Sequence, residues 1–148
     1  MTRREITAFL SALMRKKLNG KYYASEVTFN WGIEQGIVTG YEVKSCVDDF
    51  RSPNGHNLLF DKNYYVMPMS TRNTIVSQKH HAIGIYVPHR IDVTLKEEQE
   101  NPTDFTSIEY TGAGFNDGWT LSCVDKSKLL DRNIPIASCL FNMLRSGK

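Results

Sequence analysis

The chain has no long hydrophobic run, and we do not expect its N-terminal segment to be a signal peptide. A membrane-spanning helix needs about 20 consecutive apolar residues. No stretch of this sequence approaches that length, so we expect no membrane segment. Residues 6–18 are amphipathic and are interrupted by Arg15, Lys16 and Lys17. This pattern does not fit the apolar core of a signal peptide.

Cysteine is also scarce, because the chain has only Cys46, Cys123 and Cys139. The three are odd in number and far apart in sequence, so they form neither a zinc-binding motif nor a disulfide framework. Reduced, mostly buried thiols are the expected state. Such thiols are typical of a cytoplasmic protein, and we expect this protein to be cytoplasmic.

The net charge is small, because 18 basic residues face 16 acidic ones. A charge of this size does not identify a nucleic-acid partner, although it is compatible with a locally basic cleft. The sequence contains no internal repeat and no low-complexity segment. Its length predicts one domain, residues 1–148, that is large enough to bury its own hydrophobic core.

The N-terminal residues 2–18 have the pattern of an amphipathic helix. Thr2 is suited to capping the helix start, and Glu5, three residues later, completes a capping box. The apolar residues recur at helical spacing and form one stripe: Ile6, Phe9, Leu10 and Leu13. We therefore expect a helix that packs one face against a sheet.

Residues 40–45, with the sequence Gly-Tyr-Glu-Val-Lys-Ser, suit a β-strand. Side chains alternate along a strand, so Glu42 and Lys44 lie on one face. A carboxylate there is able to hold a divalent metal, while the ammonium neutralises a phosphate or positions a water molecule. A Glu-x-Lys pair also fits an ordinary ion pair on an exposed strand.

The other patterns predict an α/β domain with a mixed central β-sheet flanked by helices. Further elements are expected as follows: a strand at 22–30, a turn or short helix at 48–51, a strand at 63–67, a short helix at 70–79, a strand at 82–87 and a final helix at 135–145. Pro88 is expected to close the strand before it.

The Glu-x-Lys strand, followed by Asp49-Phe50-Arg51-Ser52 and two more strands, resembles the PD-(D/E)xK nuclease superfamily. More narrowly, the chain resembles the MmcB-like endonucleases and their phage-encoded relatives, over roughly residues 22–88. The resemblance implies a restriction-endonuclease-like fold. It also implies an endonuclease that hydrolyses DNA phosphodiester bonds with Mg²⁺ or Mn²⁺, in a phage or DNA-repair setting.

The resemblance assigns roles to individual residues. Glu42 and the Val43 carbonyl become metal ligands, and Lys44 positions the attacking water. Relatives carry a second metal-binding Asp on the strand before the Glu-x-Lys strand, but residues 30–40 contain no Asp. Glu34, brought back by a tight hairpin, or Glu26 on the first strand would have to replace it.

If neither glutamate substitutes, the chain is expected to be a catalytically inactive nuclease fold. Such a protein would bind nucleic acid or a protein partner instead. Candidate contacts to nucleic acid are Lys44, Arg51, His56 and Lys62, and each of these also fits an ordinary structural or solvated role. Asp49 is a candidate for ordering the site. The sequence leaves the oligomeric state open, a homodimer included.

Overall fold

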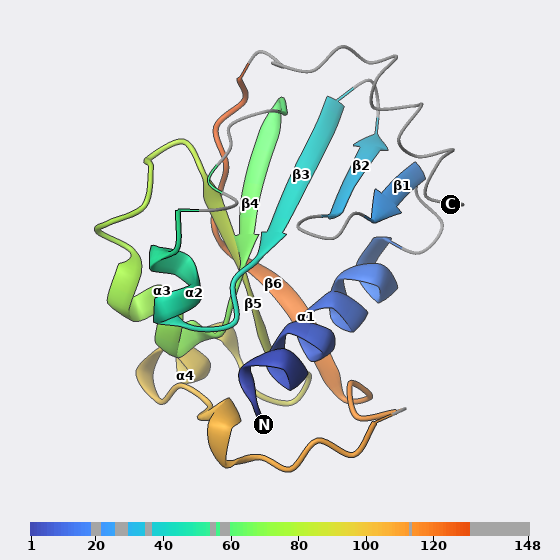
Figure 1. The fold of residues 1–148 in the computed structure, drawn as a ribbon, viewed down its shortest axis with the longest axis vertical. Helices are drawn as coiled ribbons and strands as arrows, with labels where there is room; N and C mark the ends of the chain where they lie inside the picture. Colours follow the sequence, from blue (N-terminus) through green and yellow to red (C-terminus); the bar gives the residue numbers. More distant parts are fainter. Residues whose placement is uncertain are drawn as a thin grey trace.

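The computed structural model of the chain describes residues 1–18, 22–25, 30–34, 37–53, 56, 60–112 and 114–130. The final helix predicted at 135–145 lies outside these residues, as does Glu26. The described part is an α/β structure in which helices flank a mixed β-sheet (Figure 1). The predicted fold class is confirmed at this level.

The helices are short except for the first: α1 (Arg3–Leu18), α2 (Val47–Arg51), α3 (Met69–Ile75), α4 (Leu95–Glu100) and the 3-10 helix η1 (Phe105–Ser107). Six strands form one sheet: β1 (Tyr22–Ser25), β2 (Asn30–Glu34), β3 (Ile37–Val43), β4 (Lys62–Val66), β5 (Gly84–Arg90) and β6 (Trp119–Asp125).

The strands lie in the sheet in the same order as in the chain. The first three form an antiparallel meander, β4 and β5 run parallel to β3, and β6 is antiparallel to β5. Parallel neighbours need crossover connections. The chain supplies them with α2 between β3 and β4, and with α3 between β4 and β5.

The start of α1 confirms the predicted capping box. The backbone N–H of Glu5 donates to the Thr2 hydroxyl at 3.2 Å, and the backbone N–H of Thr2 donates to the Glu5 carboxylate at 2.7 Å. Two of the N–H groups that a helix start leaves unpaired are thereby satisfied. The apolar stripe predicted for this helix is buried throughout.

The sheet separates two hydrophobic clusters, one on each face. Alternate residues of a strand belong to opposite clusters, as the twofold period of a strand requires. Tyr64 and Val66 of β4 pack with α1, whereas Tyr65 packs with α2 and α3. Figure 1 shows α1 (blue) on one side of the view and α2, α3 and α4 grouped on the other.

Two details of the sheet differ from the sequence prediction. Pro88 does not close its strand, because β5 continues to Arg90. The pairing of β4 with β5 ends at Tyr86, so Pro88 lies beyond the part of β5 that has strands on both sides. A proline, which lacks an N–H, is tolerated there. Strand β6 was not predicted. It pairs with β5 from Ile85 to Arg90, a range that includes Pro88.

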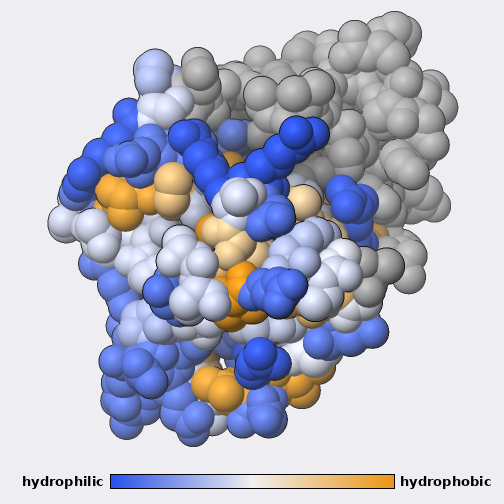
Figure 2. Space-filling view, turned by 60° about the horizontal axis from the view of Figure 1, so that its bottom comes forward, coloured by the Kyte–Doolittle hydropathy of each residue, from blue (hydrophilic) through white to orange (hydrophobic). Residues whose placement is uncertain are grey.

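In the described part of the chain, no helix is both long and apolar enough to cross a bilayer. The face shown in Figure 2 is mostly hydrophilic, and its hydrophobic residues form small separate patches. Isolated exposed apolar residues are normal on protein surfaces.

The packing of α1 leads to a testable stability difference. Phe9 is buried against Phe105, Phe115 and Trp119, with ring centroids 5.2–5.4 Å apart. We expect Phe9→Ala to lower the free energy of unfolding by about 3–5 kcal/mol, because it leaves a cavity in this aromatic cluster. Urea denaturation should be compared with Lys16→Ala on the exposed side of the same helix, which should change it by less than about 0.5 kcal/mol. Equal effects would contradict the described packing.

Candidate active site

Glu42 and Lys44 lie where β3 ends, at the carboxyl end of the parallel strands. Glu42 is paired with Tyr65 across the β3–β4 ladder. The backbone N–H of Lys44 then donates to the Val66 carbonyl at 2.9 Å, so the register continues one residue beyond the strand. In open α/β sheets, ligands bind just beyond the carboxyl ends of the strands.

The Lys44 side chain is almost entirely buried, with 3% of its surface exposed. Its Nζ lies 3.9 Å from a Glu42 carboxylate oxygen and donates to the Asp49 carbonyl at 3.4 Å. A buried ammonium needs such partners, because losing water without compensation is costly. The expected convergence of the two charged side chains is therefore observed, but inside the protein and not on an exposed strand.

Asp49 on α2 joins the turn after β3 to the N-terminal helix. Its Oδ2 accepts hydrogen bonds from the Ser45 backbone N–H at 2.9 Å and from the Ser45 hydroxyl at 3.2 Å. Its Oδ1 pairs with the Arg3 guanidinium at 2.8 Å. Burial opposes ionisation of Asp49, but the Ser45 N–H, Arg3 and Lys44 outweigh it and lower the pKa of the carboxyl.

Glu42 behaves in the opposite way. Burial is the largest cause of a raised pKa for this carboxyl. The Lys44 ammonium opposes the rise and the charge of Asp49 adds to it, so that the pKa is about 7. Desolvation penalises the charged form of an acid, and carboxyls with raised pKa values occur often in functional sites. The two acids near Lys44 therefore differ, since Asp49 is held ionised while Glu42 titrates near neutral pH.

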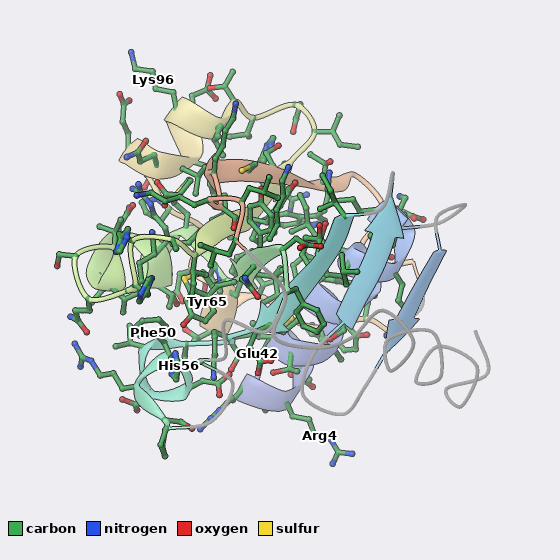
Figure 3. The ribbon with its side chains drawn as sticks, turned by 90° about the horizontal axis from the view of Figure 1, so that it is seen from above. Arg4, Glu42, Phe50, His56, Tyr65 and Lys96 are labelled. Carbon is green, nitrogen blue, oxygen red and sulfur yellow. The ribbon has the colours of Figure 1, made fainter. Side chains whose placement is uncertain are left out.

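A second group of side chains lies beside Glu42, as Figure 3 shows. The Tyr65 hydroxyl is 2.6 Å from His56 Nδ1, and His56 Nε2 is 2.8 Å from the Ser52 carbonyl oxygen. The Phe50 ring packs edge-on against both rings. Burial, followed by the charge of Glu42, raises the pKa of Tyr65 to about 12, so the phenol stays protonated near neutral pH.

The hairpin between β2 and β3 exists, but it does not bring Glu34 beside Glu42. Glu34 is paired with Ile37 at the turn end of the hairpin. Glu42 lies five residues farther along β3, which is about 17 Å at the rise of a strand. That expectation is therefore wrong. The register places Asn30 opposite Tyr41, whose side chain lies on the other face of β3 from Glu42.

The other predicted site residues are dispersed. Lys62 is paired with Thr39, three residues from the Glu42–Tyr65 pair, at the opposite end of β4. Arg51 is exposed at the end of α2 and donates to the Gln78 side chain at 3.4 Å. Neither side chain joins Lys44, and both ring nitrogens of His56 already have partners. Their predicted contacts to nucleic acid remain predictions.

The donor set near Glu42 suits a water-rich magnesium site better than an all-protein cage. Among the side chains that the structure describes, no three His, Cys, Asp or Glu residues gather to hold an ion. Mg²⁺ commonly keeps several waters and is bound through one or two carboxylates together with substrate phosphates. Glu42, with the Val43 carbonyl beside it in the chain, fits that mode.

No protein-family model, curated protein or solved structure matches the chain.

The position of Glu42 makes stability depend on pH. Its folded-state pKa of about 7 lies above the ordinary value of 4.5. The contribution of protonated Glu42 to the free energy of unfolding is thus fully present below pH 4.5, and it is lost as the pH rises through 7. In the absence of metal, we expect the unfolding free energy of the wild type to fall, relative to Glu42→Gln, by about 1–3 kcal/mol between pH 5 and pH 8. Urea titrations at both pH values measure this difference, and parallel pH profiles would contradict it.

Proposed function

We propose that the protein is a metal-dependent DNA endonuclease of the PD-(D/E)xK type, which hydrolyses phosphodiester bonds with Mg²⁺ or Mn²⁺. The observation that carries the proposal is the contact between the buried Lys44 ammonium and the mostly buried Glu42 carboxylate at the carboxyl end of β3. A buried ion pair contributes little net stability, because desolvation offsets its Coulomb energy. A role in chemistry gives a reason for placing both charges there.

The fold order supports a restriction-endonuclease-like assignment. A helix, three strands, a short helix and parallel strands follow one another in the order that the resemblance implies, with the Glu-x-Lys segment ending the third strand. We propose a phage or DNA-repair setting and a cytoplasmic location. The setting follows from the resemblance to the nuclease superfamily. The location follows from the expectation that the cysteine thiols are reduced.

In the proposed reaction, Glu42 and the Val43 carbonyl would hold the ion. A bound divalent cation lowers the pKa of water and stabilises charge that develops on the phosphate. Lys44 orients the attacking water and opposes the negative charge of the substrate. Asp49 holds Lys44 through its carbonyl oxygen and, through Arg3, connects the site to α1. Glu42 must be ionised to bind a cation, so its raised pKa predicts weaker metal binding below pH 7.

The proposal predicts that DNA cleavage is lost when the charge of either Glu42 or Lys44 is removed. Glu42→Gln and Lys44→Met keep side-chain size while removing the charge. Each should reduce Mg²⁺-dependent cleavage of plasmid or duplex DNA by at least about 100-fold, because each removes a group that acts on the reacting phosphate. Circular dichroism and urea denaturation should show that both variants remain folded.

The matched controls are Glu97→Gln and Lys96→Met, which make the same two changes on the exposed surface of α4. Lys96 lies far from Glu42 in Figure 3. Cleavage by both controls should equal that of the wild type. Wild-type rates in folded Glu42→Gln and Lys44→Met would exclude these residues as the catalytic pair.

A second candidate is a catalytically inactive nuclease fold that binds nucleic acid or a protein partner. The distance of Glu34 from Glu42 along the hairpin favours it, because the site then has fewer carboxylates than relatives use. This candidate predicts DNA binding without cleavage in either Mg²⁺ or Mn²⁺. Fluorescence anisotropy with labelled DNA should then give an affinity that falls with salt and is unchanged by Glu42→Gln. If no DNA binding is detected at low salt, a protein becomes the remaining partner for this candidate.

A further inference from the structure

The contact between His56 and Tyr65 determines where the Tyr65 hydroxyl proton points. A backbone carbonyl only accepts hydrogen bonds, so His56 Nε2 must carry the proton that it donates to the Ser52 oxygen at 2.8 Å. In the neutral ring, Nδ1 is then an acceptor. It receives the Tyr65 O–H over 2.6 Å.

An alternative acceptor on the same sheet face as the Tyr65 side chain is the Glu42 carboxylate. The two residues are direct partners in the parallel β3–β4 ladder, so their side chains leave the same face of the sheet. The Glu42 charge also contributes to the raised pKa of Tyr65, in agreement with this register. A phenol has one proton to donate. As long as His56 accepts that proton, Tyr65 does not donate it to the Glu42 carboxylate.

We propose that His56 is a positioning residue that turns the Tyr65 hydroxyl away from Glu42 and leaves the Glu42 carboxylate available to a divalent cation. This inference rests on the proposed function, because it concerns the same carboxylate. Both ring nitrogens of His56 have hydrogen-bond partners within the protein. Tyr65 is 2% exposed, so its hydroxyl must find its partner inside the protein.

The test removes the acceptor without removing the ring. His56→Phe keeps an aromatic ring against Phe50 but offers Tyr65 no acceptor. The freed hydroxyl should then donate to Glu42 and compete with the cation. We expect the Kd for Mn²⁺, measured by calorimetry at pH 8 without DNA, to rise about tenfold, because a hydrogen bond to a charged group must be broken for binding.

Three further variants separate positioning from simple packing. His56→Gln offers an amide oxygen to Tyr65 and should keep an Mn²⁺ affinity near that of the wild type. Tyr65→Phe removes the competing hydroxyl and should also bind normally. The double variant His56→Phe/Tyr65→Phe should regain the affinity that His56→Phe loses. If the double variant binds as weakly as His56→Phe, or if His56→Phe binds normally, the proposal is wrong.

Metal-free crystals of His56→Phe distinguish failure of this inference from failure of the proposed function. The proposal requires the Tyr65 hydroxyl oxygen to lie within about 3.2 Å of a Glu42 oxygen in that variant. A hydroxyl directed elsewhere overturns the positioning role, whatever the metal data show. If the wild type binds no Mn²⁺ while the hydroxyl still turns to Glu42, the proposed metal site fails and the positioning of Tyr65 stands.

Discussion

The desolvated contact between Lys44 and Glu42 is the constraint on which the rest of the site depends. Lys44 is placed in the interior by the ladder that its own backbone continues, so its ammonium has to be compensated there. Glu42 and the Asp49 carbonyl supply that compensation. Asp49 is held in turn by the Ser45 N–H and by Arg3. A chain of contacts thus runs from the end of β3 through α2 to the first turn of α1.

This arrangement gives two carboxyls close to one lysine different electrostatic properties. Asp49 accepts direct hydrogen bonds and has an arginine partner, so the pKa of its carboxyl is lowered. Glu42 lies deeper, and its contact with Lys44 is at the long limit of an ion pair, so burial prevails and its pKa is raised. Asp49 is therefore suited to holding structure, whereas Glu42, in the proposed function, would exchange a proton for a cation.

Two neighbouring tyrosines show how the sheet separates the environment of the α1 core from that of the candidate site. Tyr64 stacks on Tyr41 at 5.7 Å and contacts Tyr86 at 4.8 Å, on the face covered by α1. Tyr65 points to the other face, where it meets His56 and Glu42. The same residue type at adjacent positions packs a core on one side and borders the candidate site on the other, because strand side chains alternate.

Much of the fold follows from local pattern in the sequence. The capped α1 with its apolar stripe, the Glu-x-Lys strand and the short helix around Phe50 were all predictable, because capping and periodicity are properties of neighbouring residues. Strand β6 was not predicted, since its pairing with β5 joins segments that are distant in the chain.

The sequence by itself determined that Glu42 and Lys44 share a face. Only the tertiary structure decided that Lys44 is buried, that Glu34 is remote and that His56 meets Tyr65. Each of these depends on strand register or on packing between elements, which no local pattern specifies.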